Sequence, residues 1–295
     1  MSPESSRPVR LRRSDCSGQG LGRVKRGRGF SYVDAEGKPL TDPEEVLRVK
    51  ELAIPPAWQE VWICADPRGH LQATGVDAAG RKQYLYHPRW RELRDRAKFD
   101  HMVDFARALP KLRKRILSEL EGDELDQQRV LACAVRLLDV GLFRIGSEQY
   151  ADEDGGVGLA TVAKANVSVR DGELVFDYLA KAGVRRVQAV RDTPTVTVVG
   201  ALKRRRGGGS QLLAYREGRR WHGLRSEQIN DYLKAQMGED YSAKDFRTWN
   251  ATVLAAVSVA ADGREARSRA ARKRAIDGAV KGVATVLGNT PAVAR

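Results

Sequence analysis

The period of the hydrophobic pattern changes near residue 90, and this change constrains the fold more than any other feature of the sequence. Before it, short runs rich in β-branched and aromatic residues alternate with Gly- and Pro-containing turns, at 30–33, 61–64, 71–74 and 83–86. After it, apolar residues recur at three- and four-residue spacing over 89–98, 100–109, 111–120 and 124–140. The pattern predicts an α+β fold, in which a small antiparallel β-sheet precedes a larger, mainly helical part that contains a β-hairpin.

The same change of period divides the chain. We expect a flexible basic arm over 1–28, a β-rich N-terminal domain over 29–95 and a mainly α-helical domain over 96–295. Thr41 and Glu44 have capping-box spacing for a helix that ends near residue 52. In the helical part, 174–179 and 184–190 alternate like two strands and predict a β-hairpin with Lys181 at its tip. Further helices are expected over 226–237, 242–261 and 263–287, with Ser226 and Ser242 as N-caps.

Positive charge is the second informative feature. The chain has 52 Lys+Arg against 38 Asp+Glu, a formal net charge of +14 and a pI near 9.9. Charge of this size could simply keep a protein soluble. Here, however, the basic residues gather in three segments, 1–28, 203–206 and 264–281. Clustering favours a surface that binds a nucleic acid.

Several other classes of function lose support. No stretch approaches the length of a spanning helix, and the N-terminus lacks the apolar region of a secretory signal. Three scattered cysteines and four scattered histidines argue against a disulfide framework or a metal site, and no P-loop, dinucleotide-binding or zinc-protease motif is present. We therefore expect a soluble cytoplasmic protein, associated with the nucleoid, that has no membrane partner and no nucleotide cofactor.

The candidate functional residues are basic side chains in apolar surroundings. Arg144 lies between Phe143 and Ile145, and Arg247 follows Phe246 in KDFRTW. An arginine placed in this way has two possible roles. Its charged end can reach water past the packed neighbours, or the neighbours can hold it in position to bind a phosphate. Two such arginines and a lysine at a hairpin tip could surround one phosphodiester, with the ammonium protonating a leaving oxygen.

These segments carry a resemblance to a known family. From about Gly29 onward the chain resembles the type IB DNA topoisomerases of the small bacterial and poxviral kind. The matching segments are GRKQYLYHP at 80–88, LFRIGSEQY at 142–150, VGLAT at 157–161, FDYLAKAG at 176–183 and KDFRTW at 244–249. Several matches in the family's order are far more specific than one short match.

The resemblance implies a monomer that forms a clamp around duplex DNA, nicks one strand through a 3′-phosphotyrosyl bond, allows rotation and reseals the strand. It implies no metal and no ATP, because the covalent adduct keeps the energy of the broken bond. By motif match, Arg144 and Arg247 stabilise the transition state and Lys181 is the general acid, while Asn289 hydrogen-bonds the scissile phosphate. The implied DNA-binding residues are Lys82, Gln83, Tyr84, Tyr86 and Tyr150. For the tyrosines of the first domain, the alternative is an ordinary amphipathic strand in which one tyrosine packs inside.

The attacking group of the family is missing from this sequence. Its nucleophilic tyrosine lies a short distance past the position of Asn289, which here is just beyond Arg295, and no tyrosine follows Tyr241. We expect a truncated topoisomerase that binds duplex DNA without relaxing it. The alternatives are a noncatalytic DNA-binding paralogue and, less favoured, a tyrosine recombinase, whose helical core-binding domain the first domain does not resemble.

Overall fold

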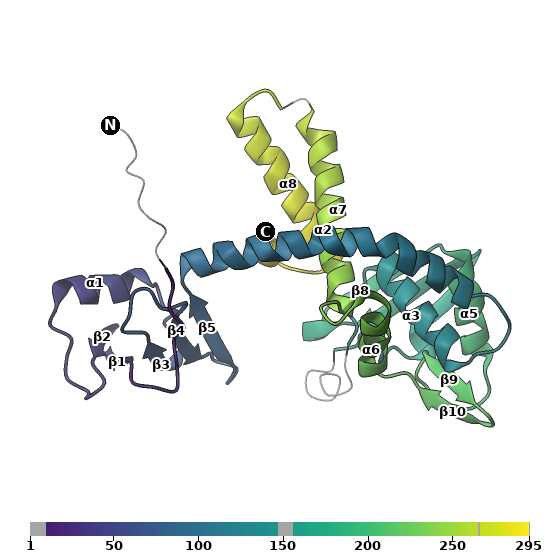
Figure 1. Cartoon of the computed structure of the whole chain (residues 1–295), viewed down its shortest axis with the longest axis horizontal. Helices are drawn as coiled ribbons and strands as arrows, with labels where there is room; N and C mark the ends of the chain where they lie inside the picture. The colour runs from purple at the N-terminus through teal and green to yellow at the C-terminus, as the bar shows by residue number, and fades with distance from the viewer. Residues whose placement is uncertain (1–9, 147–155, 265, 295) are drawn as a thin grey trace. The chain divides into compact units, whose positions relative to one another are not determined.

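A computed structural model of the chain describes residues 10–146, 156–264 and 266–294. The chain divides into two compact units, Met1–Asp100 and His101–Arg295 (Figure 1). The architecture is α+β, as the hydrophobic pattern predicts. Within the described residues, no helix is long and apolar enough to cross a membrane.

The described part of the first unit is a five-stranded antiparallel sheet with one short helix and the beginning of a longer one. Its strands are β1 (Leu21–Arg26), β2 (Gly29–Val33), β3 (Gln59–Ile63), β4 (Leu71–Val76) and β5 (Lys82–Tyr86), in the spatial order β2-β1-β3-β4-β5. Helix α1 (Pro43–Glu51) begins after Asp42, whose carboxylate accepts a hydrogen bond from the Glu44 amide. The N-cap is therefore Asp42 and not Thr41. The small core of this unit gathers Leu21, Val49, Ile54, Ile63 and Ala73.

The predicted flexible arm over 1–28 is wrong for its described part. Strand β1 lies in the middle of the sheet, between β2 and β3. Arg23 on this strand is oriented toward backbone carbonyls, donating to Ile54, Pro55 and Trp58, and its guanidinium lies 4.2 Å from the centre of the Phe30 ring. Burial lowers the pKa of Arg23. The basic composition of the segment predicts that its charges are solvated. The charge of Arg23 is instead stabilised by backbone carbonyls and by an aromatic ring.

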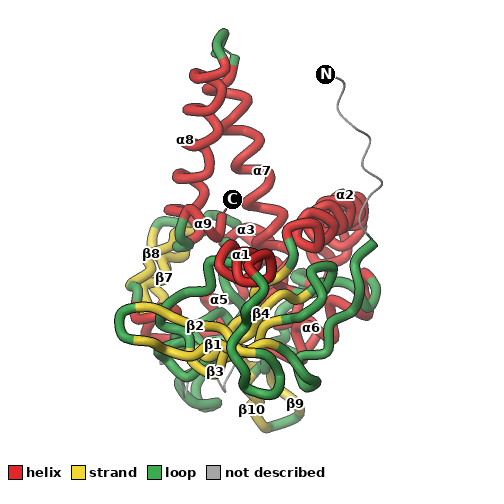
Figure 2. Tube along the Cα trace, turned by 90° about the vertical axis from the view of Figure 1, so that its left-hand side faces the viewer, coloured by secondary structure: helices red, strands yellow, loops and turns green. Residues whose placement is uncertain are grey.

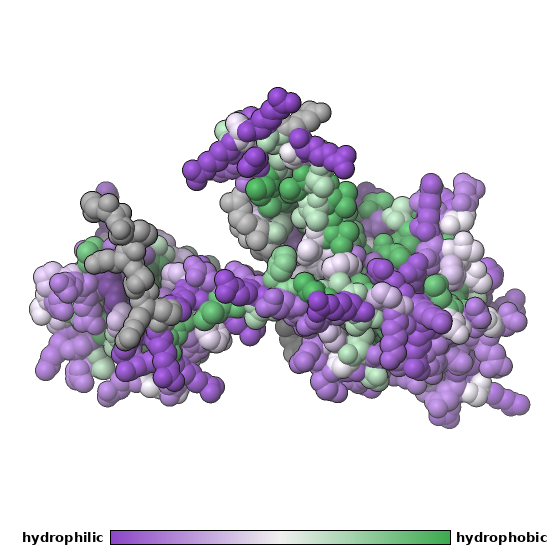
Figure 3. Space-filling model, turned by 45° about the horizontal axis from the view of Figure 1, so that its top comes forward, coloured by the Kyte–Doolittle hydropathy of each residue, from purple (hydrophilic) through white to green (hydrophobic). Residues whose placement is uncertain are grey.

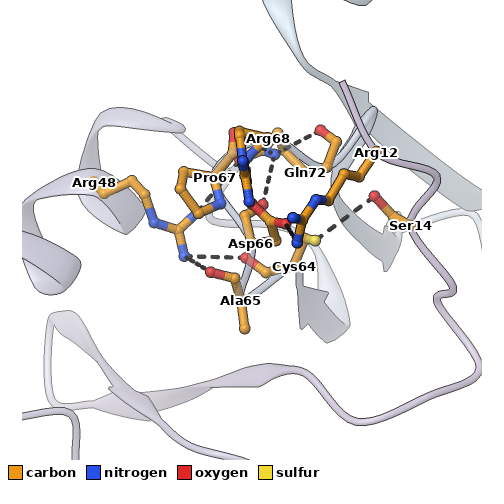
Figure 4. Close-up of polar contacts among 10 residues, drawn as sticks. Arg12, Ser14, Arg48, Cys64, Ala65, Asp66, Pro67, Arg68 and Gln72 are labelled. Atoms are coloured by element: carbon orange, nitrogen blue, oxygen red, sulfur yellow. Dashed lines mark hydrogen bonds and ion pairs between the residues drawn. The ribbon is translucent and has the colours of Figure 1, made fainter. Parts of the chain in front are cut away.

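Residues before β1 also attach to the first unit, at the turn that joins β3 to β4 (Figure 4). Arg12 pairs with Asp66 at 3.2 Å, and the Ser14 hydroxyl donates to the Leu71 carbonyl at 2.9 Å. From α1, Arg48 donates to the carbonyl of Cys64 at 3.0 Å. These contacts fix the turn from both sides.

The second unit consists of helices, a three-stranded sheet and a separate two-stranded hairpin. Its long helices are α2 (Pro88–Glu119, which begins in the first unit), α3 (Gln127–Gly141), α5 (Thr193–Arg204), α6 (Ser226–Met237), α7 (Ala243–Gly263) and α8 (Arg269–Leu287), followed by the short α9 (Pro291–Ala294). The sheet has the order β6-β7-β8, with β6 (Val167–Arg170), β7 (Glu173–Leu179) and β8 (Arg185–Val190). A separate hairpin pairs β9 (Ala214–Glu217) with β10 (Arg220–Gly223).

Helix α3 is the centre of the second unit. Eleven of its 15 residues are buried, and the surrounding core includes Phe105, Phe143, Phe176 and Phe246. Its buried Asp139 receives two hydrogen bonds from Arg113 of α2 and one from Arg136, which also pairs with Asp192 at the start of α5. Paired in this way, the buried carboxylate joins α2, α3 and α5 rather than destabilising them.

Helices α7 and α8 lie side by side and project from the rest of the second unit (Figures 1 and 2). Val253, Leu254 and Val257 of α7 and Ile276 of α8 are exposed along the projecting part. Basic side chains, among them Arg264, Arg267 and Arg269, gather at its end. Figure 3 shows apolar surface along the projecting helices and hydrophilic surface at their far end.

The strands and helices confirm most of the predicted elements, with three corrections. The helices expected over 89–98, 100–109 and 111–120 are one continuous helix, α2, which contains Pro110. Ser242 caps α7 in a capping box with Asp245, as predicted, but the N-cap of α6 is Arg225 and not Ser226. Strands β6, β9 and β10 and helix α5 have no counterpart in the prediction.

Loss of the Phe176 ring is expected to destabilise the second unit. Phe176 is fully buried and packs edge-on against Phe143, so Phe176→Ala should lower the free energy of unfolding by about 3–5 kcal/mol. Val187→Ala on the neighbouring strand, where the side chain is 61% exposed, should change it by less than about 0.5 kcal/mol. Urea denaturation measures both; equal losses would contradict this placement of the core.

Candidate active site

The first arginine of the candidate site follows the C-terminus of α3. Leu142 ends the helix in the left-handed region, with φ 58°. The next residue, Phe143, is buried and packs against Phe176 with the ring centres 4.6 Å apart. Because both of its predecessors are fixed, Arg144 is held half-buried at the edge of the second unit.

Residues 156–160 lie between the Arg144 segment and the tip of the β7–β8 hairpin. Leu159 donates its amide to the Arg144 carbonyl at 2.8 Å, and the Val157 amide donates to Leu179 at 2.9 Å. A Cβ on Gly158 would lie only 2.4 Å from the Cα of Gly146. The two backbones can approach this closely only because position 158 has no side chain.

Lys181 lies at the tip of the β7–β8 hairpin, as predicted, in a 3₁₀ turn that covers Lys181–Gly183. Its side chain is exposed. The backbone at Gly156 packs so closely against this turn that a Cβ there would lie 2.9 Å from the Cα of Lys181. The segment 156–160 thus connects the hairpin tip to the loop that carries Arg144.

The second arginine is fixed by the start of α7. The Asp245 carboxylate accepts from the Ser242 amide at 2.8 Å, and Phe246 is fully buried against Phe105. Arg247 follows at once, in the first turns of the helix. Its guanidinium donates to the carbonyl of Leu142 at 2.5 Å and to that of Leu287 at 2.8 Å, so it joins the end of α3 to the end of α8.

Three arginines converge on the C-terminal end of α8. Arg247 donates to Leu287, Arg144 donates to the Gly288 carbonyl at 3.2 Å, and Arg186 of β8 donates to the Val286 carbonyl at 2.7 Å. Arg144 also donates to the side-chain oxygen of Asn289 at 2.6 Å. The negative end of a helix dipole favours cations.

The three guanidiniums are close enough to perturb one another. Burial, and then the charges of Arg144 and Arg186, lower the pKa of Arg247 to about 10. None of the three has a carboxylate partner among the residues that the structure describes. The cluster therefore carries positive charge that no described carboxylate balances, an arrangement that suits an anion.

One tyrosine lies inside this cluster. Tyr178 stands opposite Arg186 in the β7–β8 pairing, and its hydroxyl lies 2.7 Å from the Gln188 side-chain oxygen. Its side chain is only 6% exposed. Burial raises its pKa, although Arg186, Arg247 and Arg144 act in the opposite direction. A buried hydroxyl with a raised pKa is a poor attacking group.

The structure brings together three of the four predicted catalytic residues, Arg144, Arg247 and Asn289. Lys181 is attached through the backbone of 156–160, and no described hydrogen bond joins its side chain to the other three. The sequence analysis missed Arg186. The alternation of side chains along the strand could have placed Arg186 on the inner face, since Val190 is buried and residues 188 and 186 share its face.

Strand β5 carries four of the predicted DNA-binding residues. Tyr84 and Tyr86 are 47% and 36% exposed on one face, with ring centres 6.2 Å apart and nearly parallel planes, and Lys82 is exposed beside them. Neither tyrosine packs inside, which contradicts that part of the amphipathic-strand alternative, and the opposite face of the strand packs against the core through Leu85. Gln83 lies on the opposite face, because side chains alternate along a strand, and its amide donates to Asp77 at 2.8 Å. Tyr150 lies outside the described residues.

The basic run 203–206 is not a uniformly solvated patch. The Lys203 ammonium donates to the carbonyls of Lys164 and Val167, and burial lowers its pKa. Arg205 is buried and donates to four backbone carbonyls, those of Leu202, Gly208, Gln211 and Leu212. Only Arg204 and Arg206 of the run are exposed. Our expectation that all four basic residues track a nucleic-acid backbone is corrected for Lys203 and Arg205.

Comparisons with known proteins show the family to which the chain belongs. Residues 87–295 match the family model of the eukaryotic DNA topoisomerase I catalytic core, and residues 29–77 match that of the bacterial DNA topoisomerase IB N-terminal domain. The chain therefore belongs to the type IB DNA topoisomerase family. It is 27% identical over 284 residues to DNA topoisomerase 1B of Acanthamoeba polyphaga mimivirus, which covers 94% of this chain and 84% of the relative.

Two further relatives extend the comparison. DNA topoisomerase 1 of Rabbit fibroma virus is 23% identical over 288 residues, covering 91% of this chain and 86% of the relative. DNA topoisomerase 1 of Daucus carota is 31% identical over 129 residues, which is 43% of this chain and 15% of the plant protein.

A side chain at position 158 is expected to disrupt the site. Gly158→Ala places a methyl group against the backbone of Gly146 and should displace the Arg144 segment, lowering both the free energy of unfolding and the affinity for DNA. In Gly278→Ala the new methyl group meets nothing within 4 Å, and alanine in a helix interior should stabilise the protein by roughly 0.5–1 kcal/mol. Urea denaturation and duplex-binding titrations compare the two variants. A Gly158→Ala protein with unchanged stability and affinity would refute the close approach.

Proposed function

We propose that this chain is a type IB DNA topoisomerase scaffold, which holds a phosphodiester of duplex DNA at the arginine cluster of its second unit. The complete reaction is transient cleavage of one strand through a 3′-phosphotyrosyl intermediate, rotation and religation, without ATP or a metal. The observation that carries the proposal is the convergence of Arg144, Arg186 and Arg247, with no described carboxylate to neutralise them. We further propose that the protein acts as a monomeric clamp in the cytoplasm, on the nucleoid.

The geometry of the arginines supports electrostatic catalysis. Phosphoryl transfer develops charge on the nonbridging oxygens, and guanidiniums held beforehand stabilise this charge without reorganising. Backbone carbonyls at the end of α8 hold Arg144 and Arg247. Arg144 also fixes the amide of Asn289, whose donor nitrogen can then face the phosphate.

Lys181 is suited to be the general acid. A strand can be cleaved only if the leaving 5′-oxygen acquires a proton, and an ammonium group can supply it. The exposed position of Lys181 at a hairpin tip allows it to reach a DNA strand. Its lack of a described carboxylate partner leaves the ammonium available for this transfer.

The exposed face of β5 is the proposed second contact with DNA. The stacked rings of Tyr84 and Tyr86 and the ammonium of Lys82 offer flat apolar surface and positive charge together, a combination that suits a DNA groove. Gln83 would join them only by leaving Asp77. Tyr150 remains a proposed phosphate contact by motif match alone.

By the resemblance, the family's nucleophile position lies past Asn289 and beyond Arg295, outside these 295 residues. No tyrosine follows Tyr241, and Tyr178 within the cluster is buried. We therefore propose that these 295 residues bind duplex DNA without cutting it.

Incubation with supercoiled plasmid tests this proposal directly. The chain should retard the plasmid in a native gel, while the topology stays supercoiled and no protein–DNA adduct survives denaturant. Arg247→Ala should weaken retardation, whereas Arg191→Ala, which removes an exposed arginine paired with Glu173, should not. Relaxation with a trapped adduct would show that another residue attacks and would overturn the account of the nucleophile.

A chimera that continues after Arg295 with the C-terminal residues of the mimivirus relative tests the role of Lys181. In this background, Lys181→Ala should slow single-turnover cleavage by about 10²–10⁴-fold, because the leaving oxygen loses its proton donor, and should change duplex affinity far less. Lys234→Ala, which removes a half-buried lysine of α6 paired with Glu239, is the control. Equal losses of cleavage and binding in Lys181→Ala would reassign Lys181 to phosphate anchoring.

A further inference from the structure

We infer that Arg186 is a third phosphate-binding arginine of this site, contacting a nonbridging oxygen of the DNA phosphate held by Arg144 and Arg247. The inference rests on the proposed function and adds a residue that neither the motifs nor the comparisons single out. Its evidence is the place of Arg186 on β8, its donors and the charge balance around it.

Strand register places Arg186 on the site side of the hairpin. Arg186 pairs with Tyr178, while the preceding residue, Arg185, pairs with Leu179. Side chains alternate along β8, so Arg186 shares a face with the buried Val190 and Arg185 lies on the opposite face. Two adjacent arginines therefore have opposite surroundings.

The partners of these two arginines differ as well. Arg185 forms a two-pronged ion pair with Asp177, at 2.9 and 2.7 Å, so its charge is already balanced. Arg186 makes one described hydrogen bond, from Nη2 to the Val286 carbonyl. Its Nε and Nη1 have no acceptor within the described part of the chain. These donors can bind an oxygen of a phosphate.

The charge balance around α8 favours an anion over a simple helix cap. The C-terminus of a helix carries the equivalent of roughly half a negative charge, which cannot balance three guanidiniums. The charges of Arg144 and Arg186 contribute to the lowered pKa of Arg247, so the arginines repel one another in the unbound protein. A bound phosphate would relieve this repulsion, because its negative charge would balance the guanidiniums. The close approach of the three side chains would then be favourable.

A role limited to capping α8 is the alternative, and salt dependence separates the two. Each phosphate contact adds about 0.9 to the slope of log affinity against log salt, whereas a helix cap adds nothing. Arg186→Ala should reduce the magnitude of the slope by about 0.9 and weaken duplex binding about tenfold. Arg186→Lys should keep most of the slope, because it keeps the charge.

The experiment is a fluorescence anisotropy titration of a labelled duplex over a series of KCl concentrations, using the 295-residue chain and its variants. Arg186→Gln is a second variant, since its amide can still donate to Val286 while the charge is lost. Its slope should match that of Arg186→Ala. Arg185→Ala is the matched control and should leave the slope unchanged, because that charge is paired with Asp177.

Three outcomes decide the question. A reduced slope in Arg186→Ala and Arg186→Gln, restored in Arg186→Lys, supports the inference. An unchanged slope in these variants, with or without lower affinity, overturns it and leaves Arg186 as a cap of α8. If Arg186→Ala does not fold, the Gln and Lys variants decide by the same criterion. Failure of the proposed function would look different: the unsubstituted chain would not bind duplex DNA, or Arg144→Ala would leave the slope unchanged.

Discussion

Repulsion among three arginines at the end of α8 is the constraint on which the rest of the site depends. Guanidiniums brought together without a carboxylate are unfavourable, and burial, together with the charges of Arg144 and Arg186, lowers the pKa of Arg247. They stay together because each is anchored outside the cluster: Phe143 and Phe246 are buried beside two of them, and β8 holds the third. Carbonyls of α3 and α8 compensate only part of the charge. The positive charge that remains is the basis for proposing that an anion binds there.

The backbone around the site explains much of its sequence. The family segment at 157–161 needs glycine at position 158 because two chains meet there at a distance that leaves no room for a side chain. The pairing of Leu159 with Arg144 and of Val157 with Leu179 then sets the loop and the hairpin at a fixed spacing. The lysine at the hairpin tip and the arginine after α3 are therefore positioned by one short segment, although they lie far apart in the sequence.

Local patterns predicted what depends on local structure. The hairpin, the capping box of Ser242 and Asp245, and an arginine held between apolar neighbours all follow from spacing that the sequence displays. What the sequence left out depends on tertiary contacts. Composition suggests solvated charges at Arg23, Lys203 and Arg205. In the structure, carbonyls distant in the chain accept hydrogen bonds from Arg23 and Lys203, and carbonyls of the neighbouring loop accept from Arg205. Gln83 was grouped with its tyrosine neighbours by motif, and only strand alternation separates it from them. The alternation of side chains along β8 could have predicted which face carries Arg186. Its hydrogen bond to Val286 could not be predicted, because that residue is distant in the sequence.

The central claim is that the arginine cluster is where a DNA phosphate binds, and a structure of the chain with a duplex nicked to leave a 3′-phosphate tests it most directly. The account predicts that the terminal phosphate lies within hydrogen-bond distance of Arg144, Arg186 and Arg247, and that Lys181 faces the adjacent 5′ end. A duplex bound along the exposed basic residues of α8, with the arginine cluster empty, would contradict it.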